Sequence, residues 1–264
     1  MKPADAPAPG PVPDPVTAVP DIGSIRTDID AIDRELARLV ARRSGLAAAV
    51  AAAKRAGGDT GFGWRPAREI EILRAIRVAE PGLDPILAAT IWRAMIASNL
   101  AAQGGLQVVA APGCEAAARS LVGDPGLVQA AGSVSVCLEE AAGRPHTLAV
   151  LPWPGVRDDR ALPWWMLVQA PAFARLHVCA AVPQIDTGTP PEALVVAAMA
   201  PERTGRDTVL LAGPRAALDV FGGRPVARAA GMELHAIEAM AGTASVPEAQ
   251  PDTGVRVLGA YALA

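Results

Sequence analysis

Three cations stand among apolar residues in one alanine-rich stretch near the start of the chain, "SIRTDIDAIDRELARLVARRSGLAAAVAAAKRAGG". Arg43 and Lys54 are eleven residues apart, which on an α-helix places them nearly on one face and about 16 Å apart along the axis. Two long side chains that lean toward each other can hold a small anion between them. Arg26 lies about 25 Å before Arg43 on such a helix and is rotated by roughly 100°. If all three cations bind one ligand, Arg26 must come from a second subunit.

The helix that carries these cations is predicted by its apolar positions, which recur with a period close to 3.6. Ser24 is the expected N-cap, and "AGG" follows the last turn, so we expect one helix over residues 24–55. A helix of this length needs a partner that covers its apolar stripe. Cations on a helix most often form a solvated face, so the spacing alone leaves that alternative open.

Two further helices are expected to bring polar side chains to the same place. Pro66 begins a second helix in "RPAREIEILRAIRV", which puts Arg68 and Glu69 near its start. A third helix, "LDPILAATIWRAMIASNLAAQ", carries Asn99 and Gln103 four residues apart and therefore on one face. Together these residues form a polar set in a bundle otherwise rich in Ala and Leu.

These motifs, in this order and spacing, resemble the all-helical AroQ class of chorismate mutases. The resemblance covers residues 24–104 and rests on "IRTDIDAIDRELARLVARRSGLAAAVAAAK", "WRPAREIEILRAI" and "IWRAMIASNLAAQ". It implies an all-α N-terminal three-helix mutase domain in an intertwined homodimer with sites shared between subunits. The implied substrate is chorismate, which the family rearranges to prephenate without a metal or a cofactor.

The resemblance assigns the cations and one amide to the reacting chain of the substrate. Arg26 of one subunit and Arg43 of the other would hold the two carboxylates, since arginine offers planar, bidentate donors. Lys54 and Gln103 would address the ether oxygen. Negative charge develops on that oxygen as the C–O bond breaks, so fixed donors there stabilise the transition state more than the ground state.

The remaining residues are implied to contact or support the ring. Glu69 would accept a hydrogen bond from the ring hydroxyl, and Arg68 would support the site electrostatically. Asn99 stands where the family often has Ser. Arg65 stands where some members carry an Asp that also contacts the hydroxyl, which leaves Glu69 as the sole acceptor.

After Gly105 the pattern changes to short β-type apolar runs that alternate with alanine-rich helical stretches, which is typical of an α/β domain. We therefore expect a disordered proline-rich tail at 1–22, the mutase domain at 23–104 and an α/β C-terminal domain at 105–264. The expected strands are "LQVVAAP", "TLAVLPW", "LHVCAAV", "ALVVAAMA", "DTVLLAG" and "GVRVLGAYAL". The expected helices are "CEAAARSLV", "SVCLEEAAG" and "PRAALDVFG".

The C-terminal domain has a fainter resemblance of its own. "VSVCLEEAAGRPHTLAVLPWPG" is similar to a prephenate dehydratase segment, and "GVRVLGAYAL" to the end of the ACT-like regulatory module of bifunctional P-proteins. The dehydratase Thr-Arg-Phe signature is missing, with only Thr204 and Thr208 nearby, and "PWPG" replaces the segment that carries its Glu and Asn. We therefore expect a degenerate dehydratase-like, ACT-like region without catalysis.

Composition narrows the class of protein further. Of 264 residues, 51% are hydrophobic and 19% charged, which is enough to build a buried core. The net charge of −3 argues against a nucleic-acid or membrane-surface partner, and no apolar run is long enough for a membrane span. Scattered histidines and cysteines without CxxC spacing argue against a metal site and against disulfides, so we expect a cytoplasmic protein.

Three other functions remain open on the sequence. A lyase that removes pyruvate from isochorismate needs the same cations, and a bifunctional mutase/dehydratase would use both domains. A noncatalytic sensor of aromatic metabolites is the third. The complete set of polar residues argues against the sensor, and the dehydratase-like region favours the phenylalanine and tyrosine route.

Overall fold

The computed structural model describes residues 21–58, 63–102, 106–123, 125–155, 162–240 and 253–264. At positions 54, 55, 101, 102 and 125 only the backbone is described. The chain divides into two compact units, residues 1–45 and 46–264, and the first helix spans the boundary between them. The expected disordered tail lies outside the described residues up to position 20.

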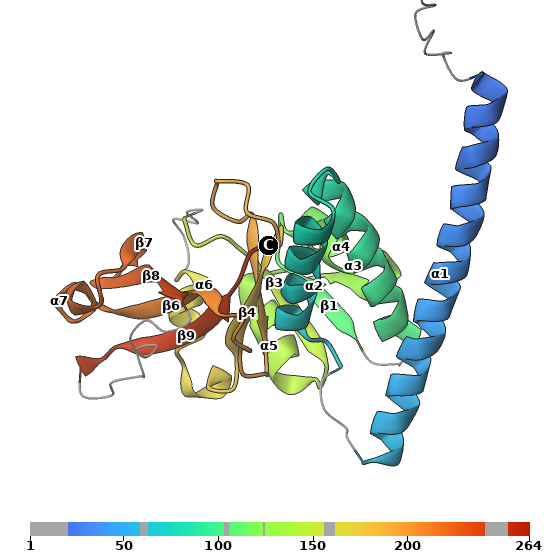
Figure 1. Ribbon diagram of the computed structural model, residues 1–264. Coiled ribbons are helices and arrows are strands. Elements are labelled where there is room, and N and C mark those ends of the chain that lie inside the picture. The colour runs from blue at the N-terminus through green and yellow to red at the C-terminus, as the bar shows by residue number, and fades with distance from the viewer. Residues whose placement is uncertain (1–20, 59–62, 103–105, 124, 156–161, 241–252) are drawn as a thin grey trace, which may run out of the picture. The chain divides into compact units, whose positions relative to one another are not determined.

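The helical elements follow one another from the N-terminus, as labelled in Figure 1. They are α1 (Ile22–Ala56), α2 (Pro66–Ala79), α3 (Pro85–Ala102), α4 (Glu115–Val122), η1 (Pro125–Leu127), α5 (Val134–Gly143), α6 (Trp164–Leu167), η2 (Pro171–Phe173), α7 (Arg215–Leu218) and η3 (Asp219–Phe221). The three expected N-terminal helices are confirmed, and so is the position of Pro66 in the first turn of α2.

The expected N-cap of α1 is wrong, because the helix begins two residues before Ser24. Asp21 does the capping instead. Its Oδ2 accepts a hydrogen bond from the Gly23 backbone N–H at 3.1 Å, and its carbonyl accepts one from Ile25 at 3.1 Å. An aspartate just before a helix offers a better acceptor for the free N–H groups of the first turn.

The strands of the described chain form a single mixed sheet of nine, in the order β2-β1-β3-β5-β4-β9-β6-β8-β7. They are β1 (Gln107–Ala110), β2 (Val128–Ala130), β3 (Thr147–Pro152), β4 (His177–Val182), β5 (Ala193–Ala197), β6 (Arg206–Pro214), β7 (Arg224–Ala229), β8 (Met232–Met240) and β9 (Arg256–Tyr261). All six expected strands are present, and β2, β7 and β8 are additional. The expected α/β character of this region is confirmed.

The first half of the sheet is built like an open α/β layer. Strands β2, β1 and β3 are parallel, and α4 and α5 connect them in chain order. Strand β5 runs antiparallel between β3 and β4. The strands β1, β3, β4 and β5 are almost wholly buried, as expected for strands covered on both faces.

The second half, β6 to β9, has a different topology. It follows the order β-α-β-β-β along the chain, and its strands lie antiparallel in the order β9-β6-β8-β7. This is the strand order of a split β-α-β, ferredoxin-like sheet. The two halves join where Val178 of β4 pairs with Gly259 of β9. Gly259 has φ +134°, and a Cβ there would lie 2.2 Å from the Val178 carbonyl oxygen, so only glycine fits the junction.

Helices α2 and α3 belong to the same compact unit as the sheet. Trp64, just before α2, and Ala97 of α3 lie in the main hydrophobic core with the strands. Leu73 of α2 and Ala89 of α3 form a smaller cluster with Ile185, which follows β4. The helices are therefore packed on the α/β region (Figure 1). Among the described helices, none combines the length and the apolar character needed to cross a membrane.

Candidate active site

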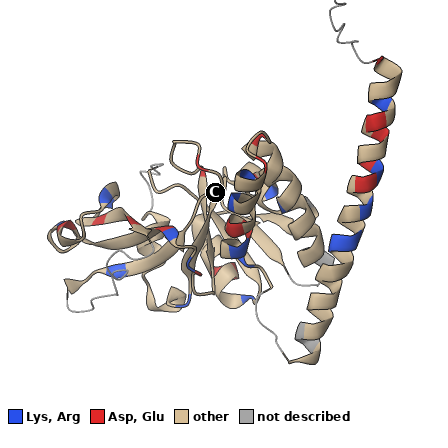
Figure 2. Cartoon of the chain, in the orientation of Figure 1, with Lys and Arg blue, Asp and Glu red and all other residues tan. Residues whose placement is uncertain are grey.

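The first helix holds Arg26 and Arg43, seventeen residues apart, so about 25 Å of helix axis separates them. Arg26 is exposed and Arg43 is half-buried. Figure 2 shows that charged residues gather in the N-terminal half of α1. Lys54 lies in the last turns of the same helix, but its side chain is outside the described part of the chain. One small ligand cannot contact both arginines of one helix.

An exposed apolar stripe runs along α1. Its members are between 41% and 62% exposed: Ile25, Ile29, Ile32, Leu36, Leu39, Val40, Leu46 and Val50. Arg43 follows Leu36 by seven residues and therefore lies on nearly the same face. A stripe of this kind normally faces a partner element, so Arg43 sits on a face that has yet to be covered.

The two residues expected at the start of α2 point in different directions. Arg68 is exposed, and its Nη1 pairs with Glu71 Oε2 at 2.9 Å on the same helix. Glu69 is only 5% exposed. The structure therefore places Glu69, and not Arg68, in a protected environment.

The Glu69 carboxylate lies against three groups from three segments. Gln184, which follows β4, donates a hydrogen bond from Nε2 to Glu69 Oε2 at 3.2 Å. Trp64 supplies a second side-chain hydrogen bond, and Arg93 of α3 supplies a positive charge. Burial raises the pKa of Glu69 from its ordinary value of 4.5 to about 7, although these three groups oppose the rise. Glu69 is thus a carboxyl group poised to change its charge near neutral pH.

Of the polar residues expected on the third helix, Asn99 is half-buried and Gln103 lies outside the described residues. The cation that α3 brings to Glu69 is Arg93, which is 8% exposed. Its Nη1 donates to the Ser120 carbonyl of α4 at 3.2 Å, and burial lowers its pKa. Arg93 was missed in the sequence because it stands alone in the apolar run "IWRAMI", where a charge that is rarely buried without a partner could have been noticed.

Position 65 has a structural partner in the α/β region. Arg65 Nη2 lies 2.9 Å from Glu202 Oε1, and its Nε donates to the same oxygen at 2.9 Å. Where some chorismate mutases carry an Asp, this chain has a cation that links the start of α2 to residues just before β6.

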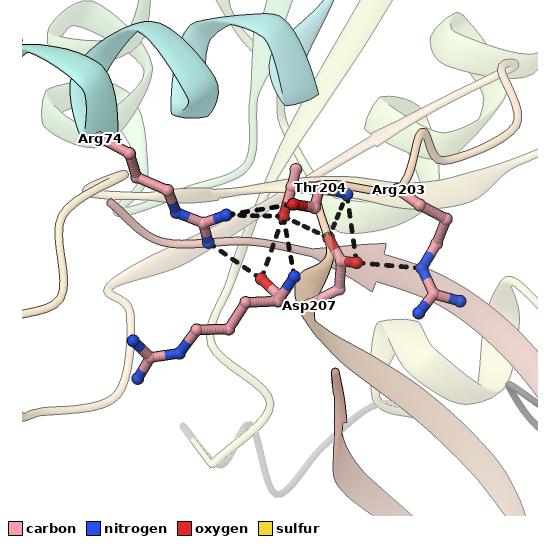
Figure 3. A network of polar contacts seen from close by, with 5 residues as sticks. Arg74, Arg203, Thr204 and Asp207 are labelled. Carbon is pink, nitrogen blue, oxygen red and sulfur yellow. Dashed lines mark hydrogen bonds and ion pairs between the residues drawn. The ribbon is translucent and has the colours of Figure 1, made fainter. Parts of the chain in front are cut away.

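The threonines near the missing dehydratase signature are also part of the framework. Thr204 donates from Oγ1 to Asp207 Oδ1 at 2.8 Å, and Asp207 pairs with Arg203 at 3.0 Å (Figure 3). Thr208 is half-buried on β6. In the part of the chain that the structure describes, no group of three or more His, Cys, Asp or Glu side chains could hold a metal ion.

Comparison with known proteins agrees with the geometry of the helices. No curated protein and no solved structure among those compared matches the chain. One family model does match, and it covers residues 25–104, the segment that holds α1, α2 and α3. Its description is chorismate mutase type II. The chain therefore carries, at residues 25–104, a domain of the chorismate mutase type II family, which is a family of isomerases.

Proposed function

We propose that this protein catalyses the rearrangement of chorismate to prephenate in the biosynthesis of phenylalanine and tyrosine. The observation that carries the proposal is the family match over residues 25–104, which includes every polar residue of the expected site. The reaction is unimolecular and needs no nucleophile or cofactor. An enzyme for it has to hold the substrate in a folded conformation and stabilise the charge on the ether oxygen.

The site draws on two chains in a homodimer. Arg43 of one subunit and Arg26 of the other hold the two substrate carboxylates. Two features of α1 support this arrangement: the axial distance of about 25 Å between these arginines, and the exposed apolar stripe beside Arg43. A second copy of the same helix is the simplest partner for such a stripe, since like surfaces meet across a two-fold axis.

The remaining residues act on the reacting bond and on the ring. Lys54 and Gln103 donate to the ether oxygen, and Glu69 accepts from the ring hydroxyl. Two printed hydrogen-bond partners do not exhaust a carboxylate, which offers about four lone-pair sites. Arg68 adds positive potential, and Asn99 completes the polar face of α3.

The α/β region, residues 105–264, takes no part in the chemical step in this proposal. A dehydratase-like origin is supported by the strand order β9-β6-β8-β7, which suits an ACT-like module at the C-terminus. The first half of the sheet supplies one α/β layer beside it. We assign this region to the stabilisation of the mutase helices.

Chorismate turnover by the purified full-length protein tests the function. Lys54→Ala should lower kcat by about 10²-fold or more, because a donor to the ether oxygen acts mainly in the transition state. Arg55→Ala, one position along the same helix, is the matched control and should keep kcat within a few-fold of the wild type. Equal activity of Lys54→Ala and the wild type would remove Lys54 from this role.

A further inference from the structure

The contact between Glu69 and Gln184 joins two regions that are 115 residues apart in the sequence. Gln184 is completely buried, with 0% exposure. Its backbone is held by the C-terminus, because the Ala264 N–H donates to the Gln184 carbonyl at 2.9 Å. The amide therefore reaches Glu69 from a fixed position in the α/β region.

The chemistry of this amide suits a carboxyl group that changes its charge. Its Nε2 donates to the Glu69 carboxylate, while its Oε1 is buried without a hydrogen-bond partner among the described residues. Glutamine carries a donor and an acceptor on one planar group. A rotation of the amide by about 180° would let Oε1 accept from a protonated Glu69 instead. Gln184 can thus satisfy either form of Glu69, but a buried amide oxygen without a partner is unfavourable, as it is beside the carboxylate form.

Helix α2 is anchored to the α/β region beside this contact. Arg74, five residues after Glu69, points across to the strands (Figure 3). Its Nη2 donates to the Leu263 carbonyl at 2.8 Å and to the Arg206 carbonyl at 3.0 Å. Its Nη1 donates to Thr204 Oγ1 at 3.0 Å. Together with the Arg65–Glu202 pair described above, these bonds fix the helix on both sides of Glu69.

We propose that Gln184 is a positioning residue of the mutase site: its amide holds the Glu69 carboxylate in place, which makes the α/β region a working part of the helical domain. The proposal rests on the mutase function proposed above. It does not place Gln184 in contact with the substrate. It assigns the α/β region a direct mechanical and electrostatic link to the residue that accepts from the ring hydroxyl.

The direction of the effect on Glu69 follows from the groups that face it. Gln184 after β4, Arg93 on α3 and Trp64 before α2 all favour the ionised carboxylate, while burial favours the protonated form. Removal of the Gln184 donor leaves burial less opposed. Glu69 should then hold its proton to a higher pH, and the form that can only accept should appear at a higher pH.

The test is the pH profile of kcat/KM for chorismate, measured on full-length protein, since this profile reports groups that titrate in the free enzyme. Gln184→Leu removes the hydrogen bond. Gln184→Glu keeps the size of the side chain and places a second carboxyl beside Glu69, so it serves if the leucine variant fails to fold. Gln169→Leu is the matched control, because the Gln169 amide bonds the Trp165 carbonyl at 3.0 Å, away from α2.

Both changes at Gln184 should move the acidic midpoint of the profile upward by about one pH unit or more, and Gln169→Leu should leave it in place. A destabilised but otherwise unaffected enzyme would lose activity without a shift of the midpoint. Profiles of folded Gln184→Leu and Gln184→Glu that coincide with the wild type would overturn the proposal.

A second readout separates this proposal from the function on which it rests. The δ-carboxyl carbons of glutamate can be followed by ¹³C NMR, with the Glu69 signal assigned through Glu69→Gln. An upward shift of the Glu69 midpoint in Gln184→Leu supports the contact even if the wild type converts no chorismate. An unchanged midpoint overturns it, whatever the activity.

Discussion

Replacement of Glu69 by glutamine removes a titrating group from a buried position while keeping the size of the side chain. Glu69 is 5% exposed, and burial raises its pKa to about 7 from an ordinary value of 4.5. In the unfolded chain the carboxyl group loses its proton near pH 4.5, whereas in the folded chain it keeps the proton until about pH 7. Between these values the folded state binds more protons, so stability falls as the pH rises.

The size of this effect follows from the width of the interval. At about 1.4 kcal/mol per pH unit, the full interval corresponds to about 3 kcal/mol, of which about 2–3 kcal/mol falls between pH 5 and pH 8. The wild type should lose this stability across that range, and Glu69→Gln should not. The variant should therefore become more stable than the wild type as the pH rises, relative to their difference at pH 5.

Urea unfolding followed by tryptophan fluorescence, at several values from pH 5 to pH 8, measures this difference. Glu71→Gln is the matched control, because Glu71 lies two residues further on the same helix and is exposed. Its curve against pH should run parallel to that of the wild type. If Glu69→Gln also runs parallel to the wild type, the carboxyl group is not held in the environment described, and the reasoning on its charge fails.

Three further outcomes follow from the same structure. Arg74→Met should lower the free energy of unfolding by roughly 2–4 kcal/mol, because it leaves the Leu263 and Arg206 carbonyls without their donor; Arg77→Met, exposed on the same helix, should change it by less than about 0.5 kcal/mol. Leu36→Glu, in the exposed stripe of α1, should shift analytical ultracentrifugation profiles toward the monomer, and Ala41→Glu on the opposite face should not. Prephenate given to the full-length protein should yield no phenylpyruvate above the enzyme-free background, and phenylpyruvate formation that depends on the protein would contradict a noncatalytic α/β region.

Regular periodicity made much of the fold predictable from the sequence. The 3.6-residue period of α1 and the proline at the start of α2 gave the helices, and buried apolar runs gave six strands. Strands β7 and β8 were missed because their sequence, "RPVARAAGMELHAIEAM", is rich in Ala and Glu, which have low strand propensity. They are strands because β6 and their mutual pairing hold them in the sheet.

The environment of Glu69 could not be predicted in the same way. Its position in the helix was clear from "RPARE", but its partners come from distant segments. Gln184 lies in a stretch without a regular period, and Arg93 is a single charge in an apolar helix. Neither has a local signal for the contact, because it is created by the packing of α2 and α3 on the α/β region.

Subunit complementation tests the central claim most directly, because it asks whether one mutase site needs two chains. Arg26→Ala and Lys54→Ala homodimers each lack one cation at both sites and should both be nearly inactive. After subunit exchange in an equal mixture, half of the dimers are mixed and each has one complete site, so activity should return to about a quarter of the wild-type value. Native mass spectrometry shows whether exchange has occurred. A mixture that contains mixed dimers and yet stays as inactive as the single variants would contradict a chorismate mutase site shared between subunits.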